Sequence, residues 1–189
     1  MRNLGFLSIL LMLAGCYGAT NSPDGGPDHD ADTEPTSDAD GPLPLETDFG
    51  MAAGQEFSCF WTSEDLVSCW GANASGQLGD GTTEERWIPT DLGNLGPVLG
   101  IATGGAHSCA WFEGGQIRCW GSNALGQIGI ASSEMTVPTP RALDPLGTVQ
   151  SMDLGESHSC ALTEDSRVHC WGSNSVGQVG EGSFGGSQD

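Results

Sequence analysis

One unit of about 50 residues occurs three times in this chain, and the repetition constrains the fold more than any other sequence feature. The copies begin at Gly54, Gly104 and Gly155 and share the frame G-x-x-[HF]-S-C-x9-C-W-G-x-N-x-x-G-Q-[LIV]-G. A period near 50 with strand-like content is typical of a β-propeller blade or a related β-repeat. Gly supplies 30 of the 189 residues, which favours a turn-rich, mostly β chain over a helical bundle.

Each copy holds two short strand-like runs on either side of a polar turn, and this arrangement predicts a β-hairpin. The turns are Glu64-Asp65, Gly114-Gly115 and Glu164-Asp165. We expect one repeat domain, 49–189. Its repeats are expected at about 49–98, 99–149 and 150–189.

The motif around and after the second Cys of each copy is expected to be scaffold. The Trp should be the main apolar anchor between neighbouring blades. The glycines should take positive φ or permit close backbone approach, and the Asn and Gln side chains should bond backbone groups of the turn. The scaffold residues are Trp70, Gly71, Asn73, Gly76, Gln77, Trp120, Gly121, Asn123, Gly126, Gln127, Trp171, Gly172, Asn174, Gly177 and Gln178.

These motifs resemble the repeats of the regulator of chromosome condensation family, whose blades carry a W-G-x-N-x-x-G-Q-L-G signature. The resemblance runs from about Phe49 to Ser183 and is closer to bacterial secreted lipoproteins than to the nuclear members. It implies blades that close into a seven-bladed propeller. Since fewer than three whole units are present, we expect an all-β, incomplete propeller. Assembly of several chains into a ring, an open array, and a chain that is the front of a longer product all remain open.

Six of the seven cysteines fall into three pairs, each ten residues apart. If each hairpin turn is centred midway, the two cysteines lie opposite on antiparallel strands, within disulfide distance. The favoured disulfides are Cys59–Cys69, Cys109–Cys119 and Cys160–Cys170. Free buried thiols are the alternative. Metal binding with His107 and His158 is disfavoured, because the first copy has Phe57 at that position and x9 spacing is unlike zinc sites. We expect no metal and no cofactor.

The N-terminus predicts export and a lipid anchor. Residues 1–15 contain Arg2 and then an apolar run, shorter than the roughly 20 residues that span a bilayer, so they are predicted to be a signal peptide. Cys16 follows two small residues and resembles the lipobox Cys of bacterial lipoproteins, which is lipidated. We therefore expect a protein anchored at the bacterial cell envelope, at the outer membrane or the cell surface.

Charge is strongly acidic, with 25 Asp and Glu against five Arg and no Lys. Nine of the acidic residues and no basic residue lie between Tyr17 and Asp48, so residues 16–48 are expected to be a lipidated Cys followed by a disordered linker. The absence of Lys excludes a Walker-A loop and Schiff-base chemistry. A net charge of −20 disfavours nucleic-acid binding.

No catalytic motif is recognisable, so we expect a non-catalytic module that binds an extracellular protein or a glycan. The candidate contact residues are Trp61, Trp87 and Trp111, because recognition on repeat scaffolds usually lies in variable loops. The family resemblance implies two alternatives, guanine-nucleotide exchange on a small GTPase and inhibition of a secreted enzyme. The export signal, the paired cysteines and the acidity argue against exchange.

Overall fold

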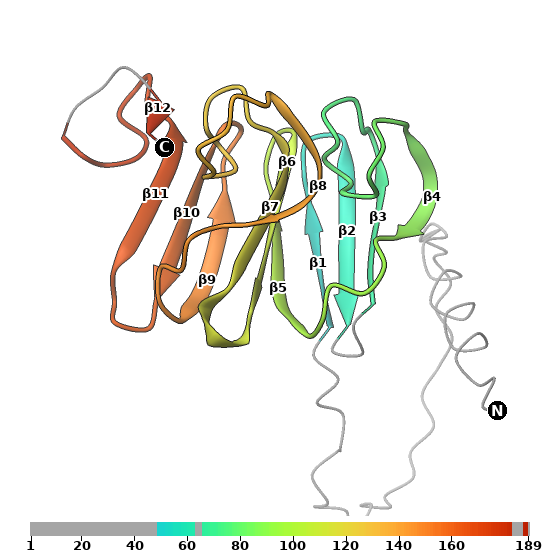
Figure 1. Ribbon diagram of the computed structural model, residues 1–189, viewed down its shortest axis with the longest axis horizontal. Helices are drawn as coiled ribbons and strands as arrows, with labels where there is room; N and C mark the ends of the chain where they lie inside the picture. The colour runs from blue at the N-terminus through green and yellow to red at the C-terminus, as the bar shows by residue number, and fades with distance from the viewer. Residues whose placement is uncertain (1–48, 63–65, 183–186, 189) are drawn as a thin grey trace, which may run out of the picture. The chain divides into compact units, whose positions relative to one another are not determined.

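The computed structural model describes residues 49–62, 66–182 and 187–188 and shows an all-β architecture of three separate antiparallel sheets (Figure 1). We call these sheets blades 1, 2 and 3. Blade 1 runs in sheet order through β1 (Phe49–Ala53), β2 (Phe57–Thr62), β3 (Val67–Gly71) and β4 (Arg86–Asp91). The prediction of an all-β, incomplete propeller is therefore confirmed.

The other two blades repeat this order. Blade 2 contains β5 (Val98–Thr103), β6 (His107–Phe112), β7 (Ile117–Ser122) and β8 (Thr136–Ala142), with the short 3-10 turn η2 (Glu113–Gly115) between β6 and β7. Blade 3 contains β9 (Val149–Leu154), β10 (His158–Thr163), β11 (Val168–Ser173) and β12 (Ser187–Gln188). In each blade the paired cysteines lie on the two middle strands.

Those cysteines form disulfides in all three blades, which confirms the predicted pairing. Cys59 pairs with Cys69 in the strand register, and the same offset recurs in the other blades. The Cα atoms of the bonded cysteines are 4.1–4.2 Å apart. A hairpin of two strands is marginal alone, so each staple stabilises the middle of its blade.

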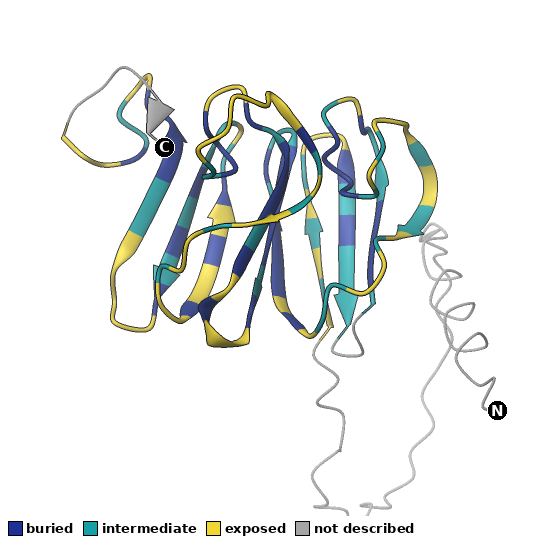
Figure 2. Ribbon diagram, viewed as in Figure 1, coloured by how far each residue is buried: buried dark blue, intermediate teal, exposed yellow. Residues whose placement is uncertain are grey.

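Strand alternation gives each blade an N-side face, toward the preceding blade, and a C-side face, toward the following one. The C-side face of blade 1 and the N-side face of blade 2 share one buried cluster, which includes Val67, Leu78, Ile101 and Trp120. A second cluster joins blades 2 and 3 in the same way. Figure 2 shows buried positions along the sheets and exposed ones on the loops and β4.

Several sequence predictions lie outside the described residues. They are the signal peptide 1–15, the lipid site Cys16, the linker 16–48 and the Glu64-Asp65 turn. Within the residues that the structure does describe, no helix has the length and apolar composition needed to cross a bilayer.

Candidate functional site

Neighbouring blades are joined through one backbone oxygen of the repeated turn. The carbonyl oxygen of Gln77 accepts a hydrogen bond from the Ser108 hydroxyl at 2.9 Å and another from the Trp120 indole N–H at 2.9 Å. The Gln127 carbonyl oxygen accepts the matching bonds from blade 3, from Ser159 at 2.8 Å and Trp171 at 3.0 Å. Each blade therefore presents a carbonyl on its C-side face and a Ser and a Trp on its N-side face.

The turn that carries this carbonyl is built by its own side chains. In blade 1, Asn73 accepts a hydrogen bond from the Leu78 amide through Oδ1, at 3.0 Å, and Gln77 accepts one from the Ser75 amide through Oε1, at 2.9 Å. Gly79 has φ of +79°, and a Cβ there would lie 2.6 Å from the Trp120 indole nitrogen. The glycine thus permits both the backbone conformation and the close approach of the next blade.

His107 adds a further contact at the junction of blades 2 and 3. Its Nε2 lies 2.9 Å from the Ser159 hydroxyl oxygen. Since that hydroxyl donates its hydrogen to Gln127, Nε2 must carry the proton, and Nδ1 is left buried with no hydrogen-bond partner. Burial, helped by the nearby His158, lowers the pKa of His107 to about 4. The imidazole is neutral at pH 7.

The same scaffold positions are uncovered at the two ends of the array. On the N-side face of blade 1, Trp70 is half-buried, whereas Trp120 and Trp171 are buried. On the C-side face of blade 3, Gly180 has open space around it, whereas Gly129 is covered by Trp171. Residues at equivalent sequence positions therefore differ in exposure, because Trp70 and Gly180 have no neighbouring blade in the described structure.

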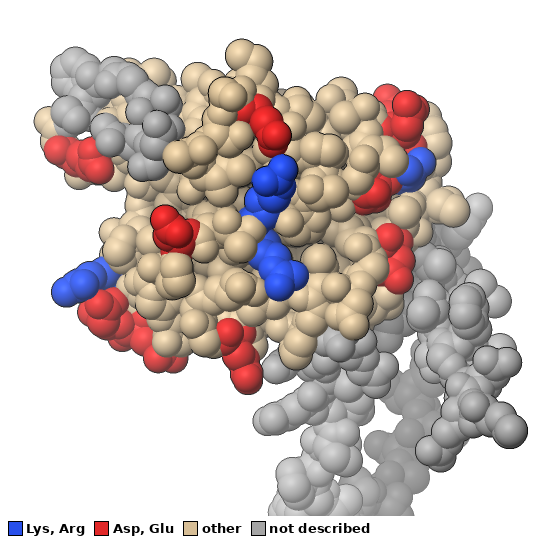
Figure 3. Space-filling view, viewed as in Figure 1, with Lys and Arg blue, Asp and Glu red and all other residues tan. Residues whose placement is uncertain are grey.

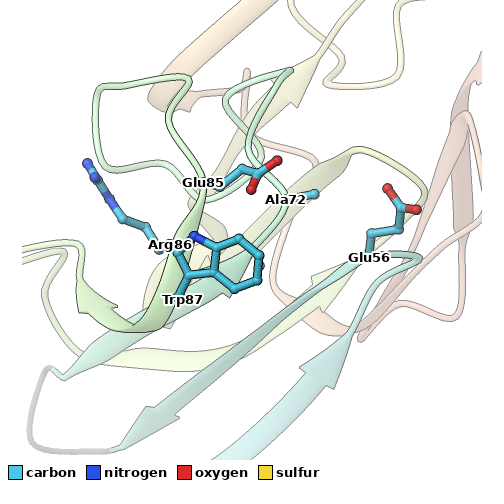
Figure 4. Close-up of a pocket in the computed structure, with 6 residues that line it drawn as sticks. Glu56, Ala72, Glu85, Arg86 and Trp87 are labelled. Atoms are coloured by element: carbon cyan, nitrogen blue, oxygen red, sulfur yellow. The ribbon is translucent and has the colours of Figure 1, made fainter.

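A shallow pocket of about 270 Å³ lies on this uncovered face of blade 1. It is lined by Glu56, Gly71, Ala72, Glu85, Arg86 and Trp87 (Figure 4). The Trp87 side chain is 88% exposed, and Figure 4 shows Arg86 extending away from Glu56. An exposed indole beside an acidic pocket is a suitable contact for a protein partner, since Trp is enriched at interface hot spots.

A salt bridge holds the loop that leads into Trp87. Arg86 lies 2.6 Å from the Asp80 carboxylate, and the Thr82 hydroxyl and amide also donate to that carboxylate. Burial alone raises the pKa of Asp80, but the hydrogen bonds from Thr82 and Arg86 and the positive charge of Arg86 together lower it below its ordinary value. The ionised carboxylate therefore keeps this segment ordered on the rim of the pocket.

The structure separates the three candidate tryptophans. Trp61 and Trp111 are half-buried and pack against the two clusters between blades, where Gly50 and Gly100 make room for their rings. They are packing residues in this structure, and Trp87 is the one that is exposed. Met51 was not among the candidates from the sequence, and it is 71% exposed on the same face of blade 1.

Other site chemistry is limited. Among the described residues, no three His, Cys, Asp or Glu side chains lie together in an arrangement that would hold a metal ion. Figure 3 shows acidic side chains spread over the visible face with few basic ones among them. The features that stand out are thus uncovered blade faces rather than an enclosed chemical site.

Three packed blades with a repeated carbonyl junction define a β-propeller repeat protein. Models of the Regulator of chromosome condensation (RCC1) repeat match residues 98–127 and 149–178 in one case and residues 64–111 in the other. The chain belongs to the RCC1-type repeat family. It is 34% identical over 137 residues to the ultraviolet-B receptor UVR8 of Arabidopsis thaliana, a match that covers 70% of this chain and 31% of that protein.

Solved structures agree with this assignment. Human WBSCR16 matches with a TM-score of 0.62 and 27% identity, covering 70% of this chain and 35% of that one. Yeast RCC1 (Prp20), in its structure bound to Kap60, matches with a TM-score of 0.60 and 26% identity, covering 70% and 31%. The chain thus spans about a third of the length of the relatives it matches. Its repeat propeller fold is that of a protein-interaction module.

Proposed function

We propose that the chain is a non-catalytic protein-binding module, exported and held at the bacterial cell envelope by a lipid on Cys16. The acidic segment 16–48 tethers the repeats, and the N-side face of blade 1, with Trp87, holds a partner protein. One observation carries the proposal. The scaffold positions of this face are uncovered in the described structure, whereas the matching positions of blades 2 and 3 pack against the preceding blade.

Two features support export. The three disulfides require an oxidising compartment, and such bonds are rare in the reducing cytosol. Independently, Cys16 follows a charged start, an apolar run and two small residues, the order expected of a lipoprotein signal. The acidic linker suits a tether, because its like charges repel and extend it.

One relative, yeast Prp20p, has a different role, since it has binding properties to Gsp1p and histones. The three disulfides and the net charge of −20 argue against a nuclear role for this chain. A glycan occupant of the pocket is an alternative that the experiment below separates from a protein.

The first test is mass spectrometry of the N-terminus after cell fractionation. We expect a lipid-modified Cys16 in the membrane fraction and loss of membrane attachment in Cys16→Ser. An unprocessed Met1 in the cytosol would overturn the envelope assignment.

The second test places a photo-crosslinking amino acid at Trp87 in the full chain in the envelope. A matched probe at Met135, which is 70% exposed in blade 2, is the control. We expect a protein adduct from position 87 at least tenfold above that from position 135. Equal yields, or release of the bound material by glycosidase alone, would refute protein binding at this face.

A further inference from the structure

Each end of the array carries one half of an interface that the chain makes twice between its own blades. The C-side face of blade 3 exposes Val168 to 66%, although the residues at its place in the other blades, Val67 and Ile117, are buried. The turn of the same blade leaves Gly180 open where Gly79 and Gly129 are covered by an indole. This face therefore has the carbonyl turn and an apolar surface, but no blade against it in the described structure.

The N-side face of blade 1 is the other half. Met51 is 71% exposed, whereas the residues at its place in the strand register, Ile101 and Met152, are buried. Ser58 and Trp70 stand where Ser108 and Trp120 donate to the Gln77 carbonyl in the next junction. The donors of blade 1 therefore match the acceptor that blade 3 presents.

Trp87 belongs to the same face. Gly71 pairs with Arg86, and Gly121 pairs with Val137, so Trp87 occupies in β4 the place that Pro138 occupies in β8. Pro138 contacts the turn of the preceding blade. A Cβ on Gly76 would lie 2.6 Å from the Pro138 Cα, and the Pro138 carbonyl oxygen accepts a hydrogen bond from the Gly81 amide at 2.9 Å. The pocket beside Trp87 is therefore the place where a preceding blade's turn would lie.

Side-chain sizes at the two ends are exchanged in a complementary way. At the internal junctions a large residue of the C-side face, Trp61 or Trp111, packs against the cluster that holds a small residue of the next blade, Ala110 or Ala161. The positions equivalent to these in the register are Leu162 at the blade 3 end and Phe60 at the blade 1 end. At the internal junctions the larger residue is thus on the C-side face, whereas at the ends the C-side face carries the smaller residue, Leu162, and the N-side face the larger one, Phe60.

We propose that a second copy of this chain docks head to tail, with the C-side face of its blade 3 against the N-side face of blade 1. This inference rests on the proposed function and names the partner of that face. Its junction repeats the internal ones, with Ser58 and Trp70 donating to the Gln178 carbonyl and Phe60 packed beside Leu162. Such a junction is heterologous, because it joins two different faces, and it covers one end face of each copy.

The test uses two full-length copies with different tags, expressed together in the envelope, with one copy isotopically heavy. A photo-crosslinking residue at Met51 is expected to form adducts between heavy and light chains, with the acceptor within residues 168–182. Met51→Glu is expected to reduce co-capture at least tenfold because it places a charge in an apolar junction. The control is Met135→Glu, since Met135 is equally exposed but lies away from both end faces.

A second matched pair of variants tests the C-side face of blade 3. Gly180 and Gly93 both have φ of +78° and open space around them, and Asn tolerates this conformation. Gly180→Asn fills the place of the incoming indole and is expected to reduce co-capture at least tenfold, whereas Gly93→Asn leaves it within twofold.

A rescue experiment tests the exchange of sizes. Trp61 and Trp111 each pair with a glycine, whereas Leu162 pairs with Ser151, so Leu162→Trp is combined with Ser151→Gly. This double variant should lose assembly, and adding Phe60→Ala should restore it by recreating an internal junction.

The outcomes separate this inference from the proposed function. Adducts of Met51 with a different envelope protein, with no adducts between heavy and light chains, would overturn the head-to-tail inference and leave the binding module standing. Adducts with residues 16–48 of the same chain would also overturn it, because the linker would then cover the face. No protein adduct at either Met51 or Trp87 would overturn both.

Discussion

The pH dependence of stability should report directly on the junction between blades 2 and 3. His107 is buried there and its pKa is lowered to about 4 from 6.5, mainly by burial. The unfolded state therefore binds the proton more tightly, so stability is present above pH 6.5 and is lost as the pH falls toward 4. For these two values, linkage predicts that the free energy of unfolding decreases by about 2 kcal/mol between pH 7 and pH 5.

The assay is urea unfolding of the oxidised protein at steps from pH 7 to pH 5, compared with His107→Phe. Phe is the matched replacement, because blade 1 has Phe57 at this position and its junction carbonyl still accepts from Ser108. We expect the variant to lose about 1 kcal/mol at pH 7 with the imidazole hydrogen bond, but to change by less than about 0.5 kcal/mol across the range.

The two aspartates with lowered pKa values should not contribute to the loss of stability between pH 7 and pH 5. The pKa of Asp165 is lowered by the Thr163 hydroxyl and that of Asp80 by the hydrogen bonds described above. Their contribution to stability is present above about pH 4 and is lost only below it. An equal loss of stability in the wild type and in His107→Phe would show that this imidazole does not control the transition.

Three other predictions follow from exposure and packing. Trp87→Ala should change the free energy of unfolding by less than about 0.5 kcal/mol while removing the position-specific contact with the partner. Trp61→Ala should destabilise the protein by about 3 kcal/mol. Similar destabilisation in both variants would contradict the placement of these rings. Under mild reductant, alkylation and mass spectrometry should find the blade 3 disulfide opened first, because its cysteines are half-buried and the others are fully buried. Gly129→Ala should destabilise by at least 2 kcal/mol more than Gly180→Ala in thermal melts, since both strain the backbone but only the first meets an indole ring.

The class of fold and the disulfides could be predicted from the sequence because both follow from periodicity. The repeat length specifies a blade, and a ten-residue spacing centred on a turn places the cysteines opposite each other. Such arguments use only local geometry, which the same frame imposes three times.

Exposure could not be predicted, because it depends on which blade has a neighbour. Trp70 and Trp120 follow identical motifs, and the first is half-buried and the second fully buried. Trp61 and Trp87 are the same residue type and equally apolar. Only Gly50, which pairs with Trp61 across the strands, indicates that the Trp61 ring packs over the sheet. A glycine paired across strands with a Trp is the signal that would have separated them.

The acceptor at each junction is a main-chain carbonyl, so no substitution at Gln77 or Gln127 can delete it. The incoming blade has to bring only a hydroxyl and an indole, both encoded within its own unit. Duplication of one unit in the gene would therefore add a module that already fits the module ahead of it. Arrays of this kind can lengthen by whole steps without any compensating change elsewhere.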